Sequence, residues 1–82
     1  MIQIGLISDT HSHIDQNISS FFKNCREIWH AGDIGSAEVL DYLETLAPVR
    51  AVYGNIDGRE LRSCLPEHQR FTLESIDVLM TH

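Results

Sequence analysis

Short apolar runs alternate with amphipathic helical stretches along this chain, and this alternation limits its fold more than any other feature. The runs span residues 2–8, 26–32 and 49–55. Each is short and ends in polar or glycine residues, which is typical of a buried strand. The first helical stretch has an apolar face of Ile14, Ile18, Phe21, Phe22 and Cys25. The second has an apolar face of Val39, Leu40, Leu43 and Leu46. The order β-α-β-α-β predicts an α/β fold with a parallel sheet and right-handed crossovers.

Local signals predict where the helices begin and where the pattern changes. Asp15 and Ser36 stand at the positions expected for the N-caps of the two helices. Residues 56–67 contain a glycine and a proline and lose the earlier periodicity, which predicts an irregular segment. Residues 70–82 have the composition of two strands, so we expect a hairpin that turns near Ser75.

Composition excludes several classes of protein. The 82 residues carry a formal net charge of -6, and their few basic residues are scattered, so nucleic acid is not an expected partner. No apolar run approaches the about 20 residues that cross a bilayer, and the start lacks the features of a signal peptide. Cys25 and Cys64 form no metal or redox motif. We therefore expect a protein without membrane contact in a reducing, cytoplasmic location.

Each predicted strand ends in a polar cluster that could hold a metal. The clusters contain Asp9 and His11, then His30 and Asp33, then Asn55 and Asp57, and finally His82. The carboxyl ends of parallel strands are where α/β sheets bind ligands, so these side chains are expected to converge. Mixed carboxylate, amide and imidazole donors suit Mn²⁺, Fe²⁺, Zn²⁺ or Ni²⁺ better than Ca²⁺ or Mg²⁺. If residues 9–11 stay extended, Asp9 and His11 project to one side and can share an ion, while Asp33 can bridge two.

The succession "SDTH", "HAGD", "YGNID" and "MTH" resembles the calcineurin-like metallophosphoesterase superfamily, in particular its small bacterial and archaeal branch of dinuclear phosphodiesterases. The resemblance implies a two-layer αββα sandwich with two divalent metal ions at one edge, Mn²⁺ first and Zn²⁺, Fe²⁺ or Ni²⁺ as alternatives. The family's final Gly-His-x-His motif lies beyond the motifs present here. The resemblance therefore implies that residues 1–82 are the N-terminal part of a single domain, incomplete at the C-terminus.

The resemblance also implies roles for individual residues. Asp9 and His11 would hold the first metal, Asn55 and His82 the second, and Asp33 both. Asp33 and Asn55 are therefore the expected catalytic residues. The implied reaction is hydrolysis of a small phosphate ester, in which a hydroxide held between the ions attacks phosphorus in line. Ile56 stands where many relatives have a histidine, so the proton donor to the leaving group stays unassigned.

Two further hypotheses come from other classes of protein. The first is a phosphoesterase-fold scaffold that binds proteins without catalysis, although the presence of every expected ligand position favours an enzyme. The second is a nucleotide-binding half, which would need a glycine-rich turn that "SDTHSH" lacks. We also expect homo-oligomers, because an incomplete sandwich leaves apolar sheet surface uncovered.

The remaining polar residues near these clusters have structural interpretations. His13 could contact phosphate or make a hydrogen bond at the entry to the first helix. His30 is expected to orient Asp33 rather than bind metal. Asp57 is expected to cap its own loop, and His68 to be a surface residue.

Overall fold

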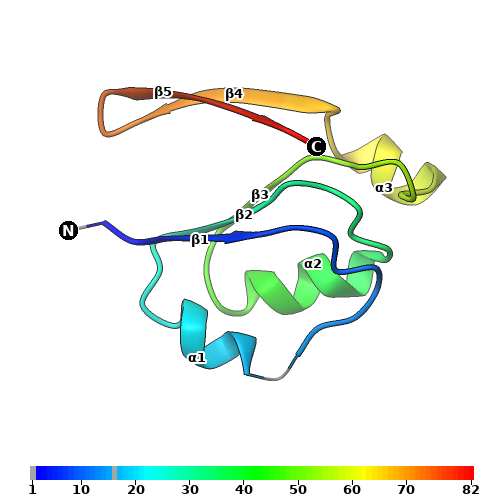
Figure 1. The fold of residues 1–82 in the computed structure, drawn as a ribbon, viewed down its shortest axis with the longest axis horizontal. Coiled ribbons are helices and arrows are strands. Elements are labelled where there is room, and N and C mark those ends of the chain that lie inside the picture. The colour runs from blue at the N-terminus through cyan, green and yellow to red at the C-terminus, as the bar shows by residue number, and fades with distance from the viewer. Residues whose placement is uncertain (1, 16) are drawn as a thin grey trace.

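The computed structural model describes residues 2–15 and 17–82, in layers of helices, sheet and hairpin. In chain order the elements are β1 (Ile4–Ile7), α1 (Ile18–Phe22), β2 (Glu27–His30), α2 (Ala37–Glu44), β3 (Val49–Ala51), α3 (Arg59–Cys64), β4 (His68–Leu73) and β5 (Ile76–Thr81). Within these residues β1, β2 and β3 pair in parallel in that order, and β4 pairs antiparallel with β5. Figure 1 shows α1 and α2 on one face of the parallel sheet and the hairpin over the other. The predicted α/β class and its parallel start are confirmed. None of the described helices is long and apolar enough to cross a bilayer.

The core lies between the parallel sheet and α2. Ile28, on the central strand β2, is fully buried. Val39 and Leu43, from the predicted apolar face of the second helix, are buried against it. Leu40 and Leu46 pack partly buried beside them. The helical periodicity therefore identified the face of α2 that the sheet covers.

The first helix is shorter than its sequence pattern predicts. The chain turns toward β2 directly after α1, where the Cys25 N–H donates to the Phe22 carbonyl at 3.0 Å. Phe22 packs on Gly5 of β1, where an added Cβ would lie 2.6 Å from the phenyl ring. Phe21, predicted on the core face, is 79% exposed. That prediction is wrong because so short a helix presents only a narrow stripe to the sheet.

The two predicted N-caps have different outcomes. Ser36 is the N-cap of α2, and its carbonyl accepts the Val39 N–H at 3.2 Å, so this prediction is confirmed. Asp15 is not the N-cap of α1, because Asn17 takes that position. The Asp15 carboxylate instead accepts the Asn17 N–H at 2.8 Å in the turn before the helix. The Asp15 carbonyl also accepts the N–H of Ile18, the first residue of α1, at 3.0 Å, so the residue stabilises the entry to the helix without being its N-cap.

Helix α3 forms in the segment predicted to be irregular, so that prediction is wrong. The helix begins after Gly58, whose carbonyl accepts the Arg62 N–H at 2.9 Å, and it buries Leu61. A helix of this length offers too few apolar residues to establish a period between the flanking glycine and proline. Its role in the structure is to place Arg62 beside the loop that follows β3.

Aromatic and charged contacts fix the hairpin to the sheet. Trp29 of β2 meets Phe71 of β4 edge to face, with ring centroids 5.0 Å apart and planes at 83°. The Arg50 guanidinium lies 4.1 Å from the centre of the Phe71 ring. The Glu27 carboxylate accepts hydrogen bonds from Arg50 at 2.6 Å and from the Trp29 indole at 2.9 Å. These contacts hold the hairpin over β2 and β3.

The hairpin turns at the position that the sequence predicts. Glu74 and Ser75 join β4 to β5 with φ angles of 51° and 67°, the left-handed backbone of a tight hairpin turn. The register of the strands pairs His68 with Thr81. As a result β5 returns the chain to the carboxyl ends of the parallel strands, where Figure 1 shows the C-terminus.

The core contact of α2 gives a first prediction. Replacing the fully buried Leu43 with alanine should lower the free energy of unfolding by about 2–5 kcal/mol, because it removes apolar contacts and leaves a cavity. The half-buried Leu40→Ala change should cost clearly less. Urea denaturation of both variants measures the difference. Equal losses of unfolding free energy in the two variants would show that Leu43 is not more deeply buried in the core than Leu40.

Candidate metal centre

Backbone hydrogen bonds continue the pairing of β1 and β2 into the loops that follow them. The bonds run from Ala31 N–H to the Ile7 carbonyl (2.9 Å), Asp9 to Gly32 (2.9 Å), His11 to Asp33 (3.0 Å) and Ser12 to Ile34 (2.7 Å). Two of the predicted metal ligands, His11 and Asp33, are therefore joined through their own backbones. The loop after β1 (residues 8–13) and the loop after β2 (residues 31–36) are therefore joined by a continuous series of backbone hydrogen bonds.

The backbone in these loops is left-handed at several residues that carry side chains. Asp9, His11, Ser12 and Asp33 have φ angles of 57°, 49°, 69° and 57°. The premise that residues 9–11 stay extended is therefore wrong. Such conformations cost free energy and persist where neighbouring contacts enforce them, here the bonds between the two loops. Gly35 has φ of 100°, and a Cβ there would overlap the Ser12 backbone, so only glycine allows the loops to meet.

The structure brings most of the predicted ligands together at this edge of the sheet. Asp9, Asp33 and His82 each offer a ligand atom, and these atoms all lie within 4.8 Å of one another. His11 Nε2 lies 3.8 Å from Asp9 Oδ1 and 3.8 Å from Asp33 Oδ2. Asp9 and His11 thus reach the same point although the stretch between them is not extended.

His82 is oriented by a hydrogen bond from its other ring nitrogen. Its Nδ1 lies 2.8 Å from the Ala31 carbonyl, which can only accept, so Nδ1 carries the proton. In the neutral ring Nε2 then presents a lone pair 3.2 Å from Asp33 Oδ2. Two lone pairs at that distance repel unless a proton or a cation lies between them. Gly32 permits this arrangement, because a Cβ there would lie 2.8 Å from the imidazole.

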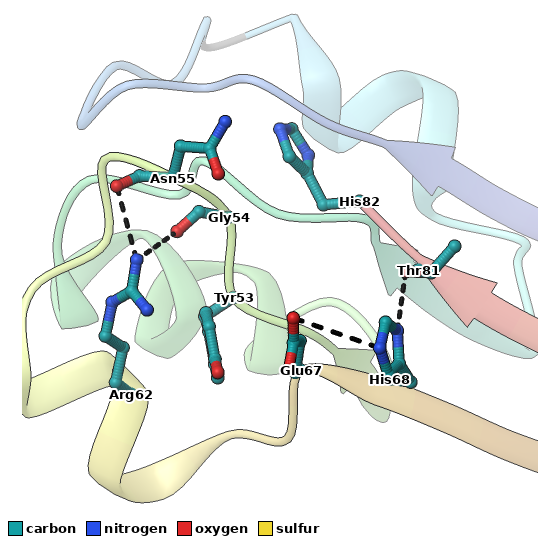
Figure 2. A pocket seen from close by; sticks show the side chains of 8 residues that line it. All are labelled: Tyr53, Gly54, Asn55, Arg62, Glu67, His68, Thr81 and His82. Carbon is teal, nitrogen blue, oxygen red and sulfur yellow. Dashed lines mark hydrogen bonds and ion pairs between the residues drawn. The ribbon is translucent and has the colours of Figure 1, made fainter.

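Asn55 approaches the site from the loop after β3 and shares a pocket with His82. The pocket has a volume of about 130 Å³ and is lined by Tyr53, Gly54, Asn55, Arg62, Glu67, His68, Thr81 and His82. Figure 2 shows Asn55 and His82 on one side of it and Arg62 and His68 on the other. His68 is exposed, as predicted, but it also lines this pocket, where its Nδ1 lies 2.7 Å from the Thr81 hydroxyl.

Arg62 secures the Asn55 loop from the side of α3. Its Nε donates to the Asp57 carbonyl at 2.6 Å, and its Nη2 donates to the carbonyls of Gly54 and Asn55 at 3.2 and 3.3 Å. The guanidinium also lies 4.5 Å from the centre of the Tyr53 ring. Sequence analysis missed this contribution because α3 itself was not predicted.

Within the described residues both ring nitrogens of His30 bond to groups other than the Asp33 carboxylate, so the prediction that His30 orients this carboxylate directly is wrong. The ring is fully buried, and its Nδ1 accepts the Gly32 N–H at 3.1 Å. Its Nε2 therefore donates to the Thr10 hydroxyl at 3.0 Å, which in turn donates to the Ile34 carbonyl at 2.9 Å. This chain ties the loop after β1 to the loop after β2. Burial lowers the pKa of His30 to about 4, although nearby carboxylates pull it upward.

The pKa values of two carboxyl groups at this edge, Asp9 and Asp57, are lowered, which favours their charged forms. A hydrogen bond from the Ser8 side chain lowers the pKa of Asp9, and the nearby His82 contributes in the same direction. Burial alone would raise the pKa of Asp57, but hydrogen bonds from backbone N–H groups outweigh it and lower the pKa. Asp57 caps its own loop, as predicted, through the Gly54 N–H at 2.8 Å.

Residues 2–82 match the family described as the calcineurin-like phosphoesterase superfamily domain. The chain belongs to this superfamily. It is 42% identical over 84 aligned residues to a "Probable metallophosphoesterase" from Methanothermobacter thermautotrophicus, covering 96% of this chain and 48% of that protein. It is also 42% identical to a "Probable metallophosphoesterase" from Methanocaldococcus jannaschii, covering 96% of this chain and 42% of that protein. The chain thus spans about half the length of the curated relatives it matches.

The fold is shared with proteins whose sequences differ much more. The crystal structure of Vps29 from Chaetomium thermophilum matches with a TM-score of 0.80 at 18% identity, over 96% of this chain and 45% of that one. At this level of identity the likeness establishes the fold alone.

The donor set fits the divalent metals that this superfamily binds. Asp9, Asp33 and His82 converge, and a cation bound by both His82 Nε2 and Asp33 Oδ2 would remove the repulsion between their lone pairs, as a shared proton does in its absence. Gly54 lies so close to Asp33 that a Cβ would overlap the carboxylate, so the site is built for a packed arrangement of donors. Carboxylate and imidazole donors together are typical of first-row transition metals.

The burial of His30 gives a prediction about pH. Its pKa lies near 4 in the folded chain and at 6.5 in the unfolded chain, so the unfolded state binds the extra proton first. Stability should be complete above about pH 6.5 and fall by about 3 kcal/mol as the pH drops to 4, at about 1.4 kcal/mol per pKa unit. Urea denaturation of the wild type and His30→Gln should show the difference between them shrinking over this range. Parallel curves would mean that His30 is charged in the folded state.

Proposed function

We propose that the chain supplies donors to a two-metal phosphoesterase centre that hydrolyses a small phosphodiester or phosphomonoester. The Asp33 carboxylate is the observation that carries this proposal. Its Oδ2 lies 3.2 Å from His82 Nε2 and 3.8 Å from His11 Nε2, two imidazoles that reach it from different elements. In the proposed centre this carboxylate would bridge two ions, each of which would take one of the two imidazoles. Asp9 and His11 would complete one ion's set, and Asn55 and His82 the other's.

The chemistry divides between the ions and the chain. When bound, two divalent ions would supply a water nucleophile active near neutral pH and neutralise charge on the phosphoryl oxygens. The chain's part is to fix the donors. The Ile56 N–H holds Asp33 Oδ1 at 3.1 Å, and the Ala31 carbonyl fixes the ring of His82. Asn55, at the edge of the pocket, would offer its amide oxygen to an ion or its amide N–H to a phosphoryl oxygen.

The electrostatics of the site support a requirement for metal. The chain has a net charge of -6, and Asp9, Asp33 and Asp57 concentrate negative charge at this edge of the sheet. An anionic phosphate ester would be repelled by these carboxylates alone. Divalent ions reverse the local sign of the charge and so allow the substrate to approach. Mn²⁺ is the ion we propose first, with Zn²⁺, Fe²⁺ or Ni²⁺ as alternatives.

The retained donor set also favours an enzyme over a scaffold without catalysis. A protein that used this fold only to bind partners would not need a converging set of ligands. This chain keeps every donor position expected within its length, namely Asp9, His11, Asp33, Asn55 and His82.

Asp33 provides the direct test of the centre. Asp33→Asn should weaken Mn²⁺ binding at least about 10-fold, because it removes the charge shared by both ions. Asparagine tolerates the left-handed backbone at this position better than alanine, so the fold should persist. Asp41→Asn, on the exposed face of α2, is the charge-matched control. Binding is measured from the loss of the free Mn²⁺ signal in electron paramagnetic resonance. Equal affinities of the two variants would remove Asp33 from the centre.

A further prediction concerns turnover by the 82 residues themselves. The relatives that the chain matches are about twice as long. In the 82 residues alone, apolar side chains stay exposed to solvent: Leu6 by 69%, Ile76 by 65% and Leu79 by 67%. We expect hydrolysis of bis(p-nitrophenyl) phosphate with Mn²⁺ to be slower by at least about 10-fold than by the full-length Methanothermobacter relative, because each ion would keep extra water in place of protein ligands. Comparable rates, at verified mass, would show that the donors described here suffice.

A further inference from the structure

Asp57 has a position in the structure that capping its own loop does not explain. The residue is 2% exposed, yet among the described residues its carboxylate pairs with no cationic side chain. Its oxygens instead accept backbone N–H groups. Oδ1 accepts from Gly35 at 2.8 Å, while Oδ2 accepts from Ile34 at 3.2 Å and from Gly54 at 2.8 Å. A buried carboxylate with three such donors is satisfied and charged.

These donors belong to two different loops of the site. Ile34 and Gly35 follow Asp33 directly, in the loop after β2. Gly54 precedes Asn55 directly, in the loop after β3. Oδ2 is therefore one atom shared by the two loops that carry the proposed bridging carboxylate and the proposed amide ligand.

A second contact depends on the same junction. The Ile56 N–H donates to Asp33 Oδ1 at 3.1 Å, and Gly54 lies against the Asp33 carboxylate. Both contacts require the loop after β3 to lie where Asp57 holds it. Arg62 contacts that loop through its carbonyls and through the Tyr53 ring, and none of these groups belongs to the loop after β2, so Arg62 cannot replace the link between the two loops.

We propose that Asp57 is a positioning residue for the metal centre: it sets the spacing between Asp33 and Asn55 without touching a metal itself. The inference rests on the proposed metal-binding function. Three of the about four lone-pair sites of this carboxylate already accept N–H groups, and the side chain is only 2% exposed, so Asp57 is better placed to hold the loops than to bind a metal. Residues that orient ligands in this way commonly contribute about 10–100-fold to metal affinity.

Asp57→Asn is the sharp variant because it keeps the shape of the side chain. One of the two oxygens becomes an NH₂ group, which cannot accept a hydrogen bond. If the NH₂ takes the place of Oδ2, it faces the N–H groups of Ile34 and Gly54 and the link between the loops is lost. If it takes the place of Oδ1, it faces the N–H of Gly35, and the bond that joins Asp57 to Gly35 in the loop after β2 is lost instead.

The first measurement is Mn²⁺ affinity of the folded 82-residue chain, followed by electron paramagnetic resonance. Asp57→Asn should bind Mn²⁺ about 10–100-fold more weakly than the wild type. Leu43→Ala is the control for a general loss of stability, since Leu43 lies on the face of α2 that packs in the core. At a temperature where both variants are folded, the control should keep wild-type affinity. Wild-type affinity in Asp57→Asn would overturn the inference, as would an equal loss in both variants.

The second measurement separates this inference from the proposed function. In Asp57→Asn, amide hydrogen exchange should be accelerated selectively at Gly35, or at Ile34 and Gly54, according to which oxygen the NH₂ replaces. Leu43→Ala should accelerate exchange across the core without singling out these amides. If the wild type binds no Mn²⁺, the proposed function fails, and the exchange data still decide whether Asp57 joins the loops. Unchanged exchange at Ile34, Gly35 and Gly54 alike in Asp57→Asn would overturn that role.

Discussion

The close approach of the loops at the carboxyl edge of the sheet is the constraint on which the rest of the structure depends. The loops after β1 and β2 are bonded through their backbones, and the loop after β3 lies against Asp33. Gly35 and Gly54 allow this approach, because a side chain at either position would overlap the neighbouring loop. The left-handed angles of Asp9 and Asp33 follow from it. The strain is located at the residues whose side chains must converge, as is common at functional sites.

Two buried titratable residues hold this edge together, and their charge states differ for a physical reason. His30 is surrounded by one N–H donor and one hydroxyl, so it stays neutral and its pKa falls with burial. Asp57 is surrounded by N–H donors, which favour its charged form in spite of burial. The neutral His30 joins the loop after β1 to the loop after β2. The charged Asp57 joins the loop after β2 to the loop after β3. Hydrogen bonds, more than apolar packing, therefore define the geometry of the site.

The sequence predicted the layers of the fold better than the details of the site. Apolar runs and helical faces are local signals, so the parallel strands, the buried face of α2 and the hairpin turn could be foreseen. Phe21 and α3 could not, because each depends on how the chain turns after a short helix. The left-handed backbone of Asp9 and the partners of His30 and Asp57 are set by contacts between distant loops. Contacts between distant loops leave no local pattern in the sequence. The motifs therefore identified the donor residues but not the hydrogen bonds that orient them.

The position of His82 is set a whole strand away from the site. The residue follows β5, and its place beside Ala31 depends on the register that the Glu74–Ser75 turn imposes on the hairpin. Side chains alternate along a strand, so a shift of one residue would turn the imidazole to the opposite face and move it by about 3.4 Å. An insertion at this exposed turn, about 20 Å of strand from Asp33, would be tolerated in most surface hairpins. Here an insertion or deletion that shifts the register of the hairpin would move His82, a donor of the proposed metal centre. The tip of the hairpin should therefore accept substitutions but not insertions or deletions.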